Sequence, residues 1–410
     1  GRNIGIGVEV LNEITTGYSN IGIGANALVN TTTGSSNIAI GDGALEENTT
    51  GFGNLAFGIR ALEDNTAGNN NIAMSYNSLV FNTTGNNNVG LGLNTLTNNI
   101  SGNQNIAIGR EALVSSQTAS NHIAIGTAAL QMYNGGDAIN IAIGNNALQE
   151  FLSGTSNIAI GGEPMSDATG GSHNLAIGDN TLNVNTIGVS NIAMGQNSMM
   201  ANTSGSNNFA AGYSSLSNNT TGENNVAIGS QALLSNTTGY DNVAIGFDAM
   251  PANSTGHDNV ALGRNALLLN NSGSYNVALG HQVLFNNTGG NYNFGAGIRA
   301  LQNNTTGGDN VAIGYESLND NVSGFANVAI GDRSLTVNTI GSNNAAIGLL
   351  ALQANTTGTN NVAVGASAGF NNSTGSNSVF IGNNAGYYDN GGNRLFIESG
   401  LVGANIQLIY

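Results

Sequence analysis

The chain has 410 residues, of which only 7% are charged, with 7 basic and 23 acidic side chains and a formal net charge of −16. This balance argues against nucleic acid as a partner, because phosphate binding depends on clustered Lys and Arg. The absence of cysteine excludes a disulfide framework and thiol chemistry, and no apolar run reaches the roughly 18 residues of a membrane-spanning helix. The chain begins without a methionine, which is typical of a processed or partial product.

A 17-residue repeat fills the sequence. The motif Asn-(Ile/Val)-(Ala/Gly)-apolar-Gly begins at Asn3 and recurs with this period as far as His122. One 18-residue interval leads to Asn140, after which the 17-residue step continues to Ser378. We number the first residue of each repeat position 0 and the last position 16. Residues 1–377 form one continuous array without a linker, and residues 378–410 are predicted to be terminal rungs and a cap or transition to a following module.

Each repeat predicts one rung of a solenoid. Positions 1 and 3 are apolar and position 2 is small, as in Ile38-Ala39-Ile40, and this alternation is typical of a strand with one buried face. We expect positions 1 and 3 to point inward, together with the Leu at position 8. Nearly invariant glycines at positions 4 and 14 indicate two turns. The predicted fold is all-β, a single continuous parallel β-solenoid (β-roll) of about 24 rungs.

Stacking of the rungs would align equivalent side chains in columns. Position 11 is mostly Asn, and such amides can hydrogen-bond along a column, hold a turn through the backbone, or simply be solvated. We assign the following residues to a structural ladder: Asn48, Asn65, Asn82, Asn99, Asn202, Asn236, Asn304 and Asn355. Positions 2 and 7 are mostly small, as in Ala39 and Ala44. We expect them to form an outward strip against which parallel copies pack as a homotrimer.

Few residues could carry chemistry. Glu46-Glu47 and Glu63-Asp64 lie one repeat apart, so paired carboxylates could bind Ca²⁺ or cleave a glycosidic bond, although a solvated acidic patch is the preferred interpretation at so exposed a position. The four His residues occupy four different repeat positions, which disfavours a metal site. We therefore expect no catalytic residue, no metal and no cofactor. Asn-x-Ser/Thr sites such as Asn82-Thr83-Thr84 are glycan acceptors only in a secretory pathway.

Aromatic side chains beside the two turns are the candidate surface contacts. Positions 5 and 15 vary freely, so rings there are expected at the surface. Such rings can contact sugars, fill a partner's pocket, or make lattice or subunit contacts. The candidates are Tyr18, Phe52, Tyr76, Tyr213, Tyr240, Phe247, Tyr315 and Phe325.

The pattern Asn-x-Ala-(Ile/Val)-Gly-x-x-Ala resembles the head repeat of trimeric autotransporter adhesins. It is seen from Asn37 to Gly41 with Ala44, and again from Asn225. The resemblance implies a left-handed parallel β-roll that trimerises, although the repeat of that family is shorter than the one in this chain. The longer form ending in Asn-Thr-Thr-Gly is similar to arrays in phage tail-fibre and bacterial surface proteins. The C-terminal segments resemble the same group, whose members often continue into an endosialidase-type trimerisation chaperone: Ser378–Gly382, Asn393–Glu398 and Leu408–Tyr410.

The resemblance implies a non-enzymatic extracellular fibre, on a bacterial surface or a virion, that mediates adhesion or receptor binding. Its expected partners are other copies of itself and a host-cell surface glycan or protein, with no nucleic acid and no membrane span in this chain. Two alternatives remain open. One is a purely structural filament or spacer, and the other is a polysaccharide-cleaving fibre similar to a tailspike, for which the patch from Glu46 to Asp64 would supply the carboxylates.

Overall fold

The computed structural model describes residues 2–397, which are all-β and contain no helix. The chain divides into two compact units, one ending at Ser206 and the other beginning at Asn207. The segment Leu408–Tyr410 and the residue Glu398, both part of the C-terminal resemblance, lie outside the described residues.

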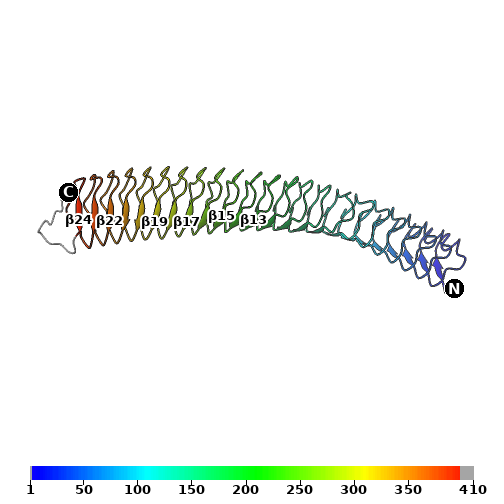
Figure 1. The fold of residues 1–410 in the computed structure, drawn as a ribbon. Helices are drawn as coiled ribbons and strands as arrows, with labels where there is room; N and C mark the ends of the chain where they lie inside the picture. Colours follow the sequence, from blue (N-terminus) through cyan, green and yellow to red (C-terminus); the bar gives the residue numbers. More distant parts are fainter. Residues whose placement is uncertain (1, 398–410) are drawn as a thin grey trace. The chain divides into compact units, whose positions relative to one another are not determined.

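Every strand of the first unit is three residues long and coincides with positions 1 to 3 of a repeat. These strands are β1 (Ile4–Ile6), β2 (Ile21–Ile23), β3 (Ile38–Ile40), β4 (Leu55–Phe57), β5 (Ile72–Met74), β6 (Val89–Leu91), β7 (Ile106–Ile108), β8 (Ile123–Ile125), β9 (Ile141–Ile143), β10 (Ile158–Ile160), β11 (Leu175–Ile177) and β12 (Ile192–Met194). Each of β1 to β11 pairs in parallel with the next strand along the chain. Figure 1 shows these successive strands in the blue to green part of the ribbon.

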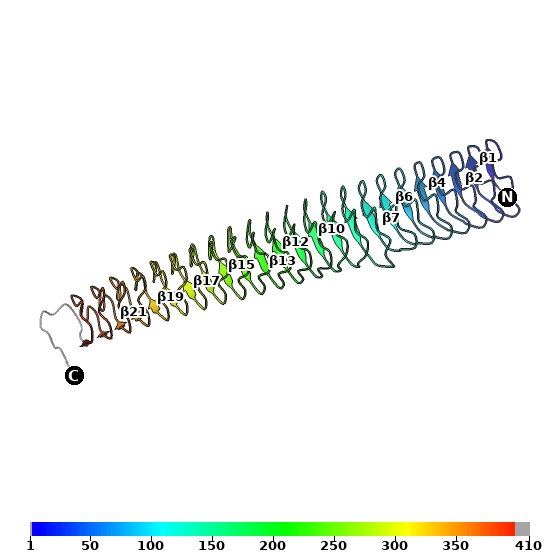
Figure 2. The same cartoon turned by 90° about the horizontal axis from the view of Figure 1, so that it is seen from above.

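The second unit is built in the same way. Its strands are β13 (Phe209–Ala211), β14 (Val226–Ile228), β15 (Val243–Ile245), β16 (Val260–Leu262), β17 (Val277–Leu279), β18 (Phe294–Ala296), β19 (Val311–Ile313), β20 (Val328–Ile330), β21 (Ala345–Ile347), β22 (Val362–Val364), β23 (Val379–Ile381) and β24 (Leu395–Ile397). They too pair in parallel and in chain order (Figure 2). One repeat is therefore one turn, and the predicted parallel β-solenoid with a 17-residue period is confirmed.

The buried face of the strands is opposite to the expected one. The small residue at position 2 is inside, as Ala244 of β15 shows with no exposed surface, whereas its neighbours Val243 and Ile245 point outward. Position 7 is also inside, together with the Leu or Met of position 8, so the interior of this rung is Ala244, Ala249 and Met250. The prediction that positions 2 and 7 form an outward strip, including Ala39 and Ala44, is wrong.

The width of the rung explains this orientation. Where position 2 is Gly295, an added Cβ would lie 2.4 Å from Val283 at position 7 and 3.8 Å from Leu284 at position 8, so side chains from these two positions already occupy the space beneath the strand. Only a methyl group fits beneath the strand when a leucine fills the space from position 8, because protein interiors are close-packed. Alternation with period two places positions 1 and 3 on one face, but it does not decide which face is inside when both are apolar.

Enlarging the interior residue should therefore destabilise the rung, while enlarging its outward neighbour should not. Ala244→Leu is expected to lower the free energy of unfolding by about 1–3 kcal/mol through overpacking. Val243→Leu, one residue away on the outer face, should change it by less than about 0.5 kcal/mol. Thermal unfolding followed by circular dichroism, with hydrogen exchange of the neighbouring rungs, measures both. Equal stability of the two variants would contradict the interior placement of Ala244.

Two columns of buried Asn run along the rungs. The Asn side chains assigned to the ladder at position 11 are all without exposed surface, so they are not solvated turn residues. Asn65 donates from Nδ2 to Oδ1 of Asn48 at 2.8 Å and to the carbonyl of Gly68 at 3.1 Å. A second column at position 0, which we did not predict as a ladder, has Asn in more of the repeats than position 11 does. There the backbone N and Nδ2 of Asn242 both donate to Oδ1 of Asn225, each at 3.1 Å.

The turns are made by glycines and, unexpectedly, by other residues in left-handed conformation. At position 4, Gly246 has φ of 139°, and an added Cβ would lie 2.6 Å from the carbonyl oxygen of Gly263. Positions 6, 8 and 16 also have positive φ, as in Gln231 (60°), Leu233 (52°) and Asp241 (53°). This conformation costs roughly 1–2 kcal/mol per non-glycine residue. The left-handed conformation lets the backbone N–H of these residues donate to a carbonyl of a neighbouring rung, as the N–H of Leu233 does to the carbonyl of Ala249.

Ser75 is the one residue other than glycine at position 4 among the complete repeats, and its φ is 121°. Such a conformation is strained for a residue with a Cβ, at about 1–3 kcal/mol. Ser75→Gly is therefore expected to stabilise the first unit by roughly 1 kcal/mol, since the added entropy of glycine in the unfolded chain offsets part of the relief. Urea unfolding measures the change. Ser115→Gly, at a position without positive φ, should not stabilise, and equal effects of the two changes would contradict the strain at Ser75.

In the last repeat the large interior residue stands at position 2 and the small one at position 8, the reverse of the usual arrangement. Phe380 occupies position 2 of β23 and is completely buried, and glycines stand at position 8 in the two last repeats. A Cβ on Gly369 would lie 2.7 Å from the ring of Phe380, so the missing leucine makes room for the phenylalanine. Phe380 also stacks on Phe396 of β24, with ring centroids 5.6 Å apart. The change of pattern at these repeats is thus a compensated repacking of the interior.

Candidate binding surfaces

All eight aromatic residues predicted as surface contacts are exposed. They lie at two corners of the rungs, beside position 4 and beside position 0, and no ring contact joins any two of them within the described residues. Two pair with arginines one rung away: the Arg264 guanidinium lies 5.7 Å from the ring centre of Phe247, and that of Arg333 lies 5.4 Å from Tyr315. The eight residues therefore do not form one site.

Tyr240 belongs to a larger group that the sequence analysis missed. Tyr240, His257, Tyr275 and Tyr292 come from four consecutive rungs at one corner, and we call them the aromatic stack. Tyr240 and His257 are parallel with centroids 4.7 Å apart, and Tyr275 and Tyr292 are parallel at 4.9 Å. His257 meets Tyr275 edge to face at 5.1 Å. The signal in the sequence is an aromatic residue at position 15 or 16 in four successive repeats.

Carboxylates lie at the same corner as the aromatic stack. Asp241 and Asp258 precede the two tyrosines at position 16, and Asp309 follows them. A carboxylate oxygen of Asp258 lies at hydrogen-bonding distance from Nδ1 of His257, at 2.9 Å. The negative charge of Asp258 raises the pKa of the Tyr275 hydroxyl above its usual range, because it opposes formation of a phenolate. Positions 15 and 16 of these rungs carry no Lys or Arg, so the corner is acidic as well as aromatic.

The outward strand residues form a second surface. Positions 1 and 3 present Ile, Val, Leu, Met and Phe side by side on adjacent strands of the first unit, and Ile, Val, Leu, Phe and Ala on those of the second. In the second unit Ile228 and Ile245 are in register on β14 and β15, and their exposed fractions are 37% and 39%. We call these two columns the aliphatic face. A contiguous exposed apolar surface of this kind commonly marks a site of protein association.

The predicted carboxylate group from Glu46 to Asp64 lies at the surface as an acidic patch. Burial, followed by the charges of Glu63 and Glu47, raises the pKa of Glu46, and Glu63 forms an ion pair with Arg60. Among the described residues no three His, Asp or Glu side chains lie close enough together to hold a metal ion. The patch is a partly exposed surface feature.

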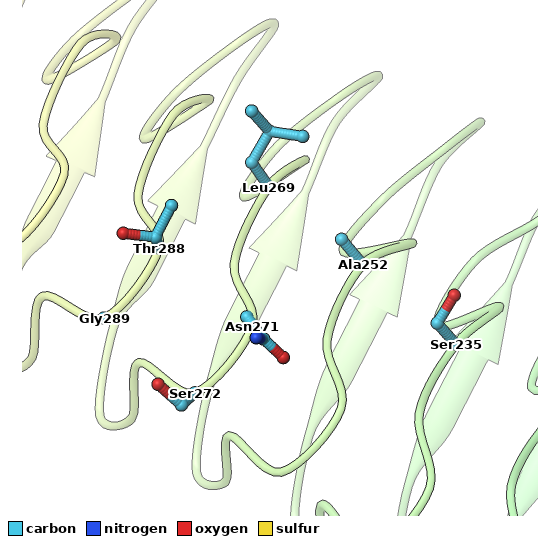
Figure 3. Close-up of a pocket in the computed structure, with 7 residues that line it drawn as sticks. All are labelled: Ser235, Ala252, Leu269, Asn271, Ser272, Thr288 and Gly289. Atoms are coloured by element: carbon cyan, nitrogen blue, oxygen red, sulfur yellow. The ribbon is translucent and has the colours of Figure 1, made fainter.

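A shallow depression lies on the second unit between neighbouring rungs. Figure 3 shows its lining, in which Leu269 is the one large apolar side chain and none is ionisable: Ser235, Ala252, Leu269, Asn271, Ser272, Thr288 and Gly289. It is open to solvent and offers no converging charges for a small ligand.

The Asn-x-Ser/Thr motif at Asn82 is inaccessible in the fold. Nδ2 of Asn82, the atom that would carry a glycan, donates to Asn65 at 2.9 Å and to the carbonyl of Gly85 at 3.1 Å. The side chain has no exposed surface. A glycan on this nitrogen is incompatible with the folded rung.

The sequence matches no protein-family model and is similar to no curated protein. In the part of the chain that the structure describes, no helix is long and apolar enough to cross a membrane.

Proposed function

We propose that this chain is the shaft of an extracellular fibre, carried by a bacterial cell or a virion, that assembles as a parallel homotrimer and mediates adhesion. The observation that carries the proposal is the aliphatic face. Rows of Ile and Val half exposed on three-residue strands are costly in water, at about 25 cal/mol for each Å², and a symmetric association of identical chains would bury them.

The other features of the rungs fit this role. Stacked rungs repeat the same side chain at intervals of about 4.8 Å, so a surface contact can recur and weak contacts can add as avidity. Neutral amides rather than charges fill the repeated interior columns, which avoids repulsion between identical groups. The exposed rings at the corners remain outside the aliphatic face and are free to contact a receptor.

Association through the aliphatic face is tested by placing charge on it. Ile228→Asp combined with Ile245→Asp should convert a trimer to monomers without unfolding the rungs, because both side chains point outward. Thr238→Asp combined with Thr255→Asp, on exposed turns of the same rungs, is the matched control and should leave the native mass unchanged. Light scattering after size exclusion measures it, and a native mass of one chain for the unaltered protein would overturn the trimer.

Adhesion is tested separately from assembly. Electron microscopy of the native source with antibodies against this chain should place it on fibres that project from cells or phage tails. Binding of the purified chain to a glycan array or to host cells then distinguishes an adhesin from a spacer. Projecting fibres that bind neither would establish the purely structural filament instead, and cleavage of an oligosaccharide would favour an enzymatic fibre.

A further inference from the structure

We propose that the aromatic stack is a binding platform for a glycan chain that carries no acidic groups. The proposal rests on the adhesive function proposed above, for which it names the receptor class and the place of contact. It is carried by four rings on consecutive rungs together with the carboxylates beside them.

The rings are ordered, yet they remain accessible. Tyr240, Tyr275 and Tyr292 are 43%, 44% and 58% exposed. Parallel rings in contact are about 3.5–4.0 Å apart, so centroid distances of 4.7 and 4.9 Å mean that the rings are offset. An offset arrangement leaves part of each face uncovered. Because each ring is held by its neighbour, little side-chain freedom is lost on binding, and this favours affinity.

The neighbouring polar groups match the rim of a sugar ring. A pyranose has an apolar face of C–H groups and an edge of hydroxyls, so it needs an aromatic surface with hydrogen-bonding groups beside it. The carboxylates of Asp241, Asp258 and Asp309 can accept from sugar hydroxyls, and the tyrosine hydroxyls can donate or accept. Rungs about 4.8 Å apart offer the same contacts repeatedly along an extended chain.

The negative charge beside the aromatic stack distinguishes between the classes of partner that could contact its rings. Nucleobases stack on aromatic side chains, but a nucleic acid would bring phosphates toward three carboxylates with no Lys or Arg in the same positions. An acidic polysaccharide meets the same repulsion. An apolar peptide needs a pocket for a buried anchor, whereas these rings lie on a convex corner. A glycan without acidic groups meets none of these difficulties.

The test is calorimetric titration of the folded chain with cellohexaose, chitohexaose and mannohexaose as neutral probes, and with hexagalacturonate as the acidic one. At least one neutral probe should bind, and hexagalacturonate should bind at least about tenfold more weakly. Tyr275→Ala combined with Tyr292→Ala should weaken neutral binding by about tenfold or more. Phe81→Ala, which removes an exposed ring of the first unit that is not among the candidate contacts, is the control and should bind as the unaltered chain does.

Each result decides one of the two proposals. Lack of binding to every neutral probe, equal affinity for hexagalacturonate, or undiminished binding by the double variant would overturn the glycan platform. Adhesion of the unaltered fibre to cells would then still stand through another surface. Conversely, glycan binding that depends on Tyr275 and Tyr292, in a fibre that adheres to no cell, would support the platform and overturn adhesion. Circular dichroism of the variants shows that they are folded.

Discussion

Asn253→Asp should destabilise the second unit by about 3–5 kcal/mol at neutral pH, although the two side chains have the same shape. Asn253 has no exposed surface. Its Nδ2 donates to Oδ1 of Asn236 at 2.8 Å and to the carbonyl of Gly256 at 3.0 Å, and its Oδ1 accepts from Asn270 at 2.9 Å. The substitution would turn two donated bonds into contacts between a buried anion and two acceptors. A buried charge without its partners typically costs this much.

Acid should partly restore the Asn253→Asp variant. A protonated carboxyl can donate one of the two lost bonds, so the pKa of the new carboxyl is expected above its usual range in the fold. The defect should therefore shrink as the pH falls toward 4. Asn271→Asp, an exposed residue of the next rung, makes the same chemical change and should cost little. Hydrogen exchange of the rungs between Asn236 and Asn287, compared at two pH values, checks both, and a pH-independent defect would contradict the electrostatic explanation.

Acidification should loosen the first unit around His122. His122 stands at position 0, where every other repeat except the last has Asn, and its side chain is fully buried with Nε2 unpartnered. Nδ1 accepts from the backbone N of Asn140 at 3.3 Å, and the ring meets Tyr133 edge to face at 4.6 Å. Burial lowers the pKa of His122 from 6.5 to about 4, against the smaller opposing effect of Asp137.

The lowered pKa of His122 in the folded chain sets the pH range over which stability changes. Above pH 6.5 His122 is neutral in both the folded and the unfolded chain, so it adds no pH dependence. Between 6.5 and about 4 the unfolded chain binds the proton more readily, and stability falls by a total of about 3 kcal/mol before levelling off. His122→Asn should remove this slope while His173→Asn, which changes an exposed residue, should keep it. Hydrogen exchange of the rungs from Asn105 to Asn157 is the measurement, and equal slopes in all three proteins would contradict the prediction.

The sequence was sufficient for the fold because its strongest signal, the 17-residue period, is also the strongest structural constraint. In-register parallel strands require equivalent residues at equal spacing, so Val226 pairs with Val243 and Val243 with Val260. The Asn column at position 11 followed from the same reasoning. The extra residue of the 18-residue interval leaves the register intact, since Ile123 still pairs with Ile141.

Two features could not be predicted: which residues of each strand face the interior, and which side chains of neighbouring rungs contact one another at the corners. Ala39 and Ile38 are both apolar, so the alternation alone allowed either to be inside, and the narrow interior decided for the alanine. From the sequence alone, His257 is considered only as a possible metal ligand and is set aside because no other histidine shares its repeat position. Its real neighbours are Tyr240 and Tyr275, which occupy different repeat positions and become adjacent only when the rungs are stacked.

The position 0 ladder has a direction. Oδ1 of Asn225 accepts from Asn242, and Oδ1 of Asn242 accepts from Asn259 in the same geometry, so each of these Asn rungs offers an acceptor to its successor and a donor to its predecessor. Removing or duplicating one whole repeat within a unit would rejoin identical donors and acceptors, and each remaining bond would be made as before. Length can therefore be altered in steps of one rung without redesigning the interior. A change of any other size keeps both Asn columns aligned only if the extra residues are accommodated outside them, as in the 18-residue interval, where Ile123 still pairs with Ile141.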